Sequence, residues 1–136
     1  MDEKKLVEAA IAAREKAYVP YSGFAVGAAL LTRGGKIYMG CNIENAAYGP
    51  SNCAERTAFF KAVSEGEREF EAIAIVGGKK SVPICDYCPP CGVCRQVMME
   101  FCDPETFRIL LPKSPAKWKT LTLGGLLPFG FGPKNL

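Results

Sequence analysis

The chain has 136 residues, of which 49% are hydrophobic and 23% charged, a composition typical of one globular domain with its own core. Its net charge of +3 comes from scattered lysines and arginines, which argues against a nucleic-acid-binding surface. No apolar run is long enough to span a membrane, and the charged N-terminus lacks the apolar core of a signal peptide, so we expect a cytoplasmic protein.

Two residue counts narrow the chemistry further: the chain has no histidine and seven cysteines. The missing histidine excludes Ser-His-Asp and Cys-His catalysis, and it also excludes metal sites that use imidazole. The acid/base residue of an enzyme would then be a carboxylate, and a transition metal would need thiolate ligands. Because the cysteines are odd in number and clustered, they favour metal chemistry over a disulfide framework.

The first half of the chain is predicted to hold a helix, a hairpin and a second helix. Apolar residues recur at helical spacing after Asp2, which can cap the first helix. The predicted bounds are a helix over 2–18, strands over 24–31 and 36–41, and a helix from Cys53 to about Ser64, with Asn52 as its N-cap and Gly66 after its end.

The second half is predicted to continue the alternation of strands and helices. The predicted bounds are a strand over 72–76 ended by Gly77-Gly78, a loop over 79–90, a helix over 92–101, and strands over 106–111 and 119–123. Gly124-Gly125 weakens a helical turn expected after the last strand. The order predicts the α/β class: a three-layer α/β/α sandwich with a mixed five-stranded sheet, forming one domain over residues 1–136.

Two short cysteine motifs lie at predicted helix N-termini: Cys53-Ala54-Glu55-Arg56 and the segment Pro90-Cys91-Gly92-Val93-Cys94-Arg95-Gln96. Free backbone N–H groups and the positive end of a helix favour a thiolate over a thiol. Thiolates from Cys53, Cys91 and Cys94 would give a tetrahedral zinc three protein ligands and leave the fourth position for water. Such an open position is typical of a catalytic zinc.

The two residues after Ala54 suit supporting roles at such a metal. Glu55 lies two positions after Cys53, so it can stand beside the metal without binding it and act as the proton carrier. Three thiolates on a divalent ion leave a charge of −1, and Arg56 could offset this charge by donating to the sulfurs. The alternative for Arg56 is an ordinary surface arginine in a first helical turn.

Further segments match one family in order along nearly the whole chain. These are Tyr21 to Leu30 (YSGFAVGAAL), Asn42 to Tyr48 (NIENAAY), Cys53 to Ala58 (CAERTA), Pro90 to Gln96, and Leu126-Leu127-Pro128 followed by Phe131-Gly132-Pro133. With these motifs the sequence resembles the small homotetrameric, zinc-dependent cytidine deaminases. The pattern of a zinc ligand, a glutamate two residues later and a distant Pro-Cys-x-x-Cys is the signature of zinc deaminases of nucleobases.

The resemblance implies an enzyme of pyrimidine salvage that hydrolyses cytidine or deoxycytidine to the uridine product and ammonia. It implies one zinc per chain, bound by Cys53, Cys91 and Cys94. Glu55 would carry a proton from the attacking water to ring nitrogen 3, and then to the leaving amine.

The resemblance also implies a set of substrate contacts. These are Phe24 against the base, Asn42 and Glu44 on the sugar 3′-hydroxyl, the Ala54 backbone N–H on the ring carbonyl, and Tyr48 and Phe131 closing the pocket. The last two imply a homotetramer with shared active sites, in which the pocket belongs to a neighbouring subunit. The expected partner is thus a small nucleoside, without nucleic acid or membrane.

Cys85 and Cys88 leave other functions open. With Cys91 and Cys94 they form four cysteines at three-residue spacing, which a structural zinc site or a nucleic-acid-binding module could use as four ligands. An iron–sulfur carrier is a further alternative, although the ferredoxin run has a longer third gap and a proline after its last cysteine. Otherwise Cys85 and Cys88 lie in a long loop and take no part in the chemistry.

Three further alternatives concern single residues. Asn42 and Glu44 could simply satisfy backbone groups of their loop. Phe129 could enter the pocket in place of Phe131. The apolar tail could also fold back onto its own core instead of reaching a neighbour.

Overall fold

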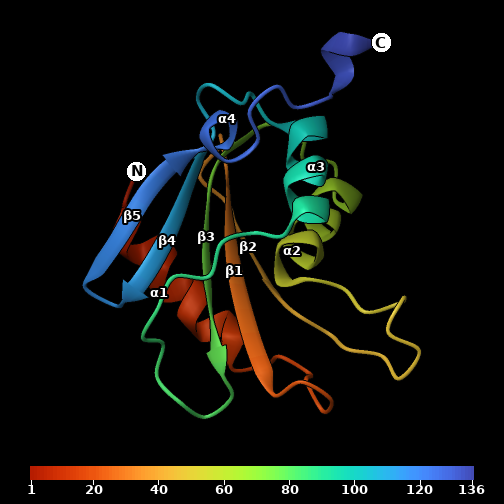
Figure 1. The fold of residues 1–136 in the computed structure, drawn as a ribbon. Coiled ribbons are helices and arrows are strands. Elements are labelled where there is room, and N and C mark those ends of the chain that lie inside the picture. The colour runs from red at the N-terminus through yellow and green to blue at the C-terminus, as the bar shows by residue number, and fades with distance from the viewer.

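A five-stranded sheet with the order β2-β1-β3-β4-β5 forms the middle layer of the protein (Figure 1). The computed structural model describes all residues from 1 to 136. The strands are β1 (Phe24–Thr32), β2 (Ile37–Cys41), β3 (Phe70–Lys79), β4 (Arg108–Ser114) and β5 (Lys117–Thr122). Only β3 and β4 pair in parallel, and the other neighbours are antiparallel, so the sheet is mixed as predicted.

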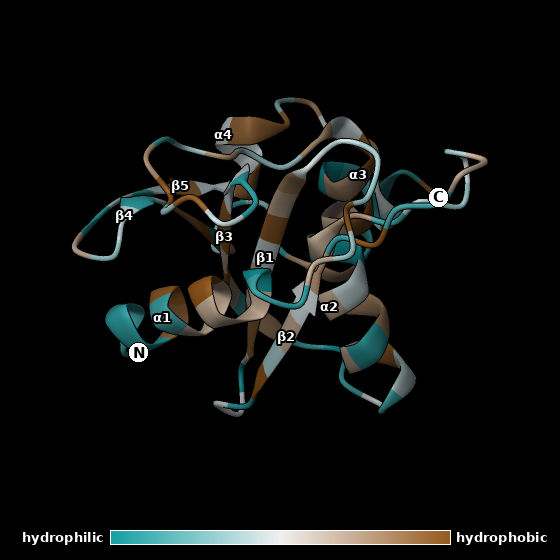
Figure 2. Ribbon diagram, turned by 90° about the horizontal axis from the view of Figure 1, so that it is seen from below, coloured by the Kyte–Doolittle hydropathy of each residue, from teal (hydrophilic) through white to brown (hydrophobic).

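Helices cover both faces of this sheet, which confirms the predicted α/β/α sandwich (Figure 2). Helix α1 (Glu3–Arg14) packs on one face, and α2 (Ala54–Ser64) and α3 (Gly92–Phe101) lie on the other. A short helix α4 (Leu123–Leu126) and a 3₁₀ turn (Pro133–Asn135) follow the last strand. No helix is both long and apolar enough to cross a membrane.

The alternation of side chains along the strands divides the core in two. On β1, Ala28 and Leu30 face the cluster beneath α2 and α3, whereas Ala29 and Leu31 face the cluster beneath α1. Successive residues of a strand point to opposite faces, so one nearly continuous apolar run supplies both clusters. The cluster under α2 and α3 is the larger one, with 18 buried residues against 10.

Two glycines let helix backbones approach the sheet closely. A Cβ atom on Gly27 of β1 would collide with the backbone of Ala10 and Arg14 in α1. A Cβ atom on Gly40 of β2 would collide with the Ala54 carbonyl oxygen and the Ala58 nitrogen in α2. The first turn of α2 therefore lies directly on β2, and its height above the sheet is fixed by backbone contact.

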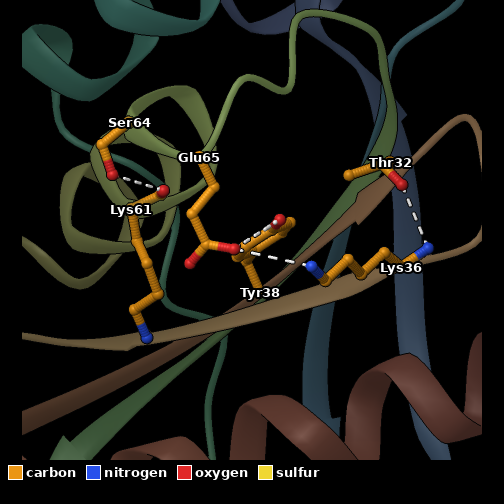
Figure 3. A network of polar contacts seen from close by, with 6 residues as sticks. All are labelled: Thr32, Lys36, Tyr38, Lys61, Ser64 and Glu65. Atoms are coloured by element: carbon orange, nitrogen blue, oxygen red, sulfur yellow. Dashed lines mark hydrogen bonds and ion pairs between the residues drawn. The ribbon is translucent and has the colours of Figure 1, made fainter.

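Polar side chains fasten α2 to β2 along its length. The Thr57 hydroxyl donates to the Cys41 carbonyl oxygen at 3.0 Å, and Lys61 Nζ donates to the Met39 carbonyl oxygen at 2.5 Å. At the end of the helix, Tyr38 Oη donates to Glu65 Oε1 at 3.1 Å, beside an exposed ion pair between Lys36 and Glu65 (Figure 3). The ion pair adds little stability by itself. Together with the three hydrogen bonds, however, it holds α2 in place along β2.

A buried arginine joins elements at the opposite end of the sheet, where β1 begins and β3 ends. Arg14, the last residue of α1, is 6% exposed. Its guanidinium donates to the carbonyl oxygens of Ala25 at 3.2 Å, Lys79 at 2.6 Å and Val82 at 2.6 Å. This one side chain joins α1 and β1 to the start of the loop that leads to Cys91.

The last two strands, predicted over 106–111 and 119–123, run over Arg108–Ser114 and Lys117–Thr122. Two further predicted boundaries were also wrong. The first helix ends at Arg14 and not at residue 18, because the chain turns there and the Tyr18 N–H donates to the Asn42 carbonyl oxygen at 3.0 Å. Strand β3 runs through Gly77-Gly78 to Lys79, because β1 continues the antiparallel ladder opposite both glycines. In each case hydrogen bonds to a distant segment overrode the local signal.

One local prediction at a helix end also needs correction, and another is confirmed. Cys53, not Asn52, is the N-cap of α2, and the Asn52 side chain donates instead to the Thr57 hydroxyl at 3.2 Å. Gly124 and Gly125 do form a helical turn, α4, whose N-cap Thr122 accepts from the Gly125 N–H at 3.1 Å. Gly124 is in close contact with the Pro104 carbonyl oxygen, to which its N–H donates at 2.8 Å.

Candidate active site

The N-termini of α2 and α3 meet and bring three cysteines together. Cys53 is the N-cap of α2 and Cys91 the N-cap of α3, and neither side chain makes a capping hydrogen bond. Cys94 lies in the first turn of α3. The three Sγ atoms all lie within 4.8 Å of one another, and those of Cys53 and Cys91 are 3.8 Å apart. The sequence predicted these three residues as ligands of one metal ion, and the structure brings their sulfur atoms together.

The donor set fits a zinc ion. Two sulfurs bound about 2.3 Å from one tetrahedral ion lie about 3.8 Å apart, which agrees with the Cys53–Cys91 separation. Cys94 is buried and Cys91 is exposed, so the cluster lies at the boundary between the core and solvent. Three sulfur donors leave a fourth position for water or substrate, as in catalytic zinc sites.

The surroundings of Cys53 favour its thiolate. Cys94 and Arg56 both donate hydrogen bonds to the Cys53 sulfur and lower the pKa of the Cys53 thiol. Arg56 Nη2 lies 3.2 Å from Cys53 Sγ. Arg56 is half-buried and its Nε has no partner, so it is not an ordinary surface arginine. The structure places it against the sulfur cluster, as the charge argument predicted.

Glu55 is a buried carboxyl beside this cluster. It is 4% exposed, and burial raises its pKa to about 7 from an ordinary value of 4.5. The negative Cys53 sulfur raises the pKa further, while Cys94 and Arg56 lower it. A carboxyl with a pKa near neutrality can both take and give a proton, which is the requirement for acid/base catalysis.

An open cavity of about 500 Å³ adjoins the cluster. Cys53 of the cluster and Arg56, which contacts Cys53, both line this cavity. This volume falls in the usual range of small-molecule sites. Asn42, Glu44 and Tyr48, three of the predicted binding residues, line the cavity. Nothing in the sequence pattern singled out Tyr21, Ser22, Ser51 and Asn52 as lining residues, although Tyr21 and Ser22 belong to the Pro-Tyr-Ser-Gly turn after α1.

Asn42 and Glu44 hold the loop backbone while lining the cavity. Asn42 Oδ1 accepts from the Val26 N–H at 2.8 Å, and its Nδ2 donates to the Phe24 carbonyl oxygen at 2.9 Å. Glu44 accepts from the N–H groups of Tyr21 and Ser22 and from the Ser22 hydroxyl. Asn42 and Glu44 thus do satisfy backbone groups, as the alternative interpretation from the sequence expected. Each side chain nevertheless keeps hydrogen-bonding capacity for a ligand.

The ionisation of Glu44 differs from that of Glu55. The Ser22 hydroxyl and two backbone N–H groups lower the pKa of the Glu44 carboxyl. Glu44 is therefore a carboxylate at neutral pH and can only accept hydrogen bonds.

Of the other predicted contacts, Ala54 and Phe24 are not among the residues that line the cavity, whereas Tyr48 is. Ala54 is the first residue of α2, so its N–H has no acceptor within the helix. Phe24 is half-exposed at the start of β1, and its ring contacts Gly77 of β3. Tyr48 has a φ of 62° and packs its ring edge-on against Tyr21, with 6.3 Å between the ring centroids.

Phe131 does not reach the cavity of its own chain. The tail projects past α3 to the C-terminus (Figure 1). Phe131 is 57% exposed and Phe129 is completely exposed, and neither lines the cavity. The two phenylalanines therefore do not fold back onto their own core, although Leu126 and Leu127 do pack against it.

Cys85 and Cys88 lie outside the sulfur cluster. Cys85 is exposed, whereas Cys88 is half-buried and contacts the same glycine, Gly77, as the Phe24 ring. Burial raises the pKa of the Cys88 thiol to about 11, so it stays protonated at neutral pH. The structure thus does not form the closed site of four consecutive cysteines that a structural zinc or an iron–sulfur cluster would use.

Comparison with known proteins decides the family. A model of the cytidine and deoxycytidylate deaminase zinc-binding region matches residues 1–109. A cytidine deaminase of Sporosarcina psychrophila is 50% identical over 136 residues, which cover 100% of this chain and 96% of that protein. The chain belongs to the cytidine deaminase family. It is therefore an enzyme of the hydrolase class, and the sulfur cluster lies in the family's zinc-binding region.

Solved structures of cytidine deaminases share the whole fold. The enzyme from Burkholderia pseudomallei superposes with a TM-score of 0.86 at 50% identity, covering 96% of this chain and 100% of that one. The enzyme from Mycobacterium tuberculosis superposes with a TM-score of 0.79 at 41% identity, covering 97% and 98%. The family resemblance stated from the sequence motifs is thus confirmed.

The burial of Glu55 makes a prediction for the metal-free protein. Its folded-state pKa of about 7 lies above the ordinary 4.5, so the protein loses stability as the pH rises through about 7. Glu55→Gln does not titrate and should escape this loss. We expect it to raise the free energy of unfolding above pH 7 by up to about 3 kcal/mol, with no gain below about pH 4.5.

Urea unfolding of both metal-free proteins across this pH range measures the difference. Glu8→Gln, at an exposed position of α1, provides the control for the substitution itself. A stability difference between Glu55→Gln and wild type that stays constant with pH would contradict a buried, titrating carboxyl.

Proposed function

We propose that this chain hydrolyses cytidine or deoxycytidine to uridine or deoxyuridine and ammonia, as a zinc-dependent enzyme of pyrimidine salvage. The observation that carries the proposal is the buried Glu55 beside three clustered cysteines, of which Cys53 lines a cavity together with Asn42 and Glu44. The cytidine deaminases that this chain resembles over its full length support the choice of substrate.

One zinc ion per chain would be held by Cys53, Cys91 and Cys94. When bound, zinc acts as a Lewis acid that lowers the pKa of water and so supplies a nucleophile at neutral pH. Arg56 donates to the Cys53 sulfur and offsets the negative charge that three thiolates leave.

Glu55 moves the protons of the reaction. It takes a proton from the attacking water and delivers it to ring nitrogen 3 as the new C4–O bond forms. Glu55 then carries the remaining proton of the new C4 hydroxyl to the amine, which leaves as ammonia as the C4–N bond breaks and the C4 carbonyl forms. Burial raises the pKa of the Glu55 carboxyl above its ordinary range, which suits a group that both takes and gives a proton.

The cavity residues orient the nucleoside. At the sugar 3′-hydroxyl, the Asn42 amide can donate or accept a hydrogen bond, whereas the Glu44 carboxylate only accepts. Phe24 lies beside the base, and the free Ala54 N–H donates to the ring carbonyl oxygen. Because Glu44 is ionised and Arg56 is engaged with Cys53, the cavity disfavours the phosphate of a nucleotide such as deoxycytidylate.

A homotetramer with shared sites accounts for the exposed aromatic residues. Phe131 is directed away from its own cavity, and Tyr48 is 73% exposed at the cavity rim. In this proposal they close the pocket of a neighbouring subunit. The domain over residues 1–136 would act in the cytoplasm, where reducing conditions keep its seven cysteines free of disulfide bonds.

Replacing Glu55 with Gln should remove nearly all turnover of cytidine and leave bound zinc unchanged. An acid/base group contributes about 10²–10⁴-fold, and here one group serves two proton transfers, so the upper end is expected. The assay is the loss of cytidine's ultraviolet absorbance, with zinc content measured on the same sample. If the variant kept more than about a tenth of the wild-type rate, Glu55 would not be the proton carrier.

Shared sites predict rescue between two inactive chains. Glu55→Gln lacks the proton carrier, and a chain without residues 129–136 lacks the tail. When the two are mixed and reassembled, the tail of the first should complete the intact glutamate site of the second and restore part of the activity. Mixing Glu55→Gln with Glu55→Ala is the control and should restore none. Mixed oligomers that form but stay inactive would exclude a site closed in trans.

A further inference from the structure

Two side chains hold the C-terminal tail on the outer face of α3. They are Arg95 and Gln96, the residues that directly follow Cys94. Arg95 Nη1 donates to the Leu126 carbonyl oxygen at 2.6 Å, and Gln96 Nε2 donates to the Phe131 carbonyl oxygen at 2.8 Å. The tail is thus attached on both sides of Phe129 to the helix that carries two of the clustered cysteines.

Arg95 also reaches the segment before Cys91. Its Nε donates to the Pro90 carbonyl oxygen at 2.8 Å, so one half-buried guanidinium bridges Pro90 and Leu126. Hydrogen bonds from a charged donor are stronger than neutral ones. The backbone next to Cys91 and the backbone at the end of α4 therefore cannot move independently.

The tail backbone contacts α3 before it projects past the helix, and the two phenylalanine side chains are exposed. Added Cβ atoms on Gly130 and Gly132 would lie 3.1 Å and 3.2 Å from the Met99 methyl carbon, so the tail backbone packs closely over that side chain. Phe129 has a φ of 53°, an unfavourable value for a residue other than glycine, and its ring is fully exposed. The backbone is held while the phenylalanine rings are left available for a contact outside the chain.

We propose that Arg95 and Gln96 are positioning residues that set the place of Phe131 relative to the cysteine cluster. This inference rests on the proposed function, in which Phe131 closes the cavity of a neighbouring chain. The N-terminal half of α3 then serves two sites: Cys94 faces the chain's own metal site, and the next two residues aim the tail at the neighbour's cavity. Because Arg95 bonds to the carbonyl oxygens of both Pro90 and Leu126, a movement of the tail also moves the backbone next to Cys91.

Gln96→Glu tests the attachment of Phe131, because glutamate has the same shape and no N–H to donate. Loss of one hydrogen bond should speed amide hydrogen exchange in residues 127–136 by about 5-fold. It should raise the KM for cytidine by a similar factor, with kcat and zinc content nearly unchanged. Gln96→Lys, which can donate again, should restore slow exchange and low KM.

Arg95→Met tests the link to the metal site. It should raise KM and also speed the loss of zinc from the loaded protein to a chelator, by about 10-fold for two charged-donor bonds. Arg68→Met is a matched control, because Arg68 also donates to two backbone carbonyls, those of Val63 and Glu67, but is exposed at the far end of α2. It should change neither quantity.

The two readouts separate the possible failures. Equal exchange of residues 127–136 in wild type and Gln96→Glu would overturn the proposal, and so would faster exchange with an unchanged KM. Zinc loss that is equal in Arg95→Met and Arg68→Met would overturn the link through Pro90. If the wild-type chain did not act on cytidine, the proposed function would fail, and the exchange experiment would still decide whether Gln96 holds the tail.

Discussion

The meeting of two helix N-termini at one point is the constraint on which the rest of the structure depends. Each helix begins at a cysteine, so the positive ends of both helices favour thiolates in the same small volume. Helix α2 reaches this point because Gly40 lets its backbone lie directly on β2. On the other side, Arg14 anchors the start of the loop that delivers Cys91 to α3. Contacts far from the sulfurs thus fix the distances between them.

The same site contains two glutamates in opposite environments. Glu55 is buried, and desolvation raises its pKa to about 7, which lowers the stability of the protein at neutral pH. Glu44 receives hydrogen bonds from Ser22 and Tyr21, which lower its pKa and keep it ionised. Two carboxyl groups whose environments shift their pKa values in opposite directions suit two roles. The buried one can exchange protons, and the hydrogen-bonded one can orient a polar ligand.

The sequence predicted the centre of the site better than its surroundings. Cys53, Cys91, Cys94 and Glu55 were identifiable because helix N-termini and residue spacing are local properties, and α3 matches its predicted bounds. The length of β3 was missed because its ladder with β1 overrides Gly77-Gly78. The contact of Cys88 with Gly77 depends on how a loop crosses the sheet, and no local pattern encodes it. The anchoring of the tail by Arg95 and Gln96 likewise joins residues 31 and 35 positions apart, beyond the reach of periodicity.

The central claim is that three specific cysteines, and neither Cys85 nor Cys88, hold one zinc ion with an open position. X-ray absorption at the zinc edge of the loaded protein tests it most directly, with a variant lacking both other cysteines, Cys85→Ser with Cys88→Ser, for comparison. The account predicts three sulfur ligands at about 2.3 Å and one lighter atom, with the same spectrum for the variant. Four sulfur ligands in the wild-type protein, or a changed spectrum in the variant, would contradict it.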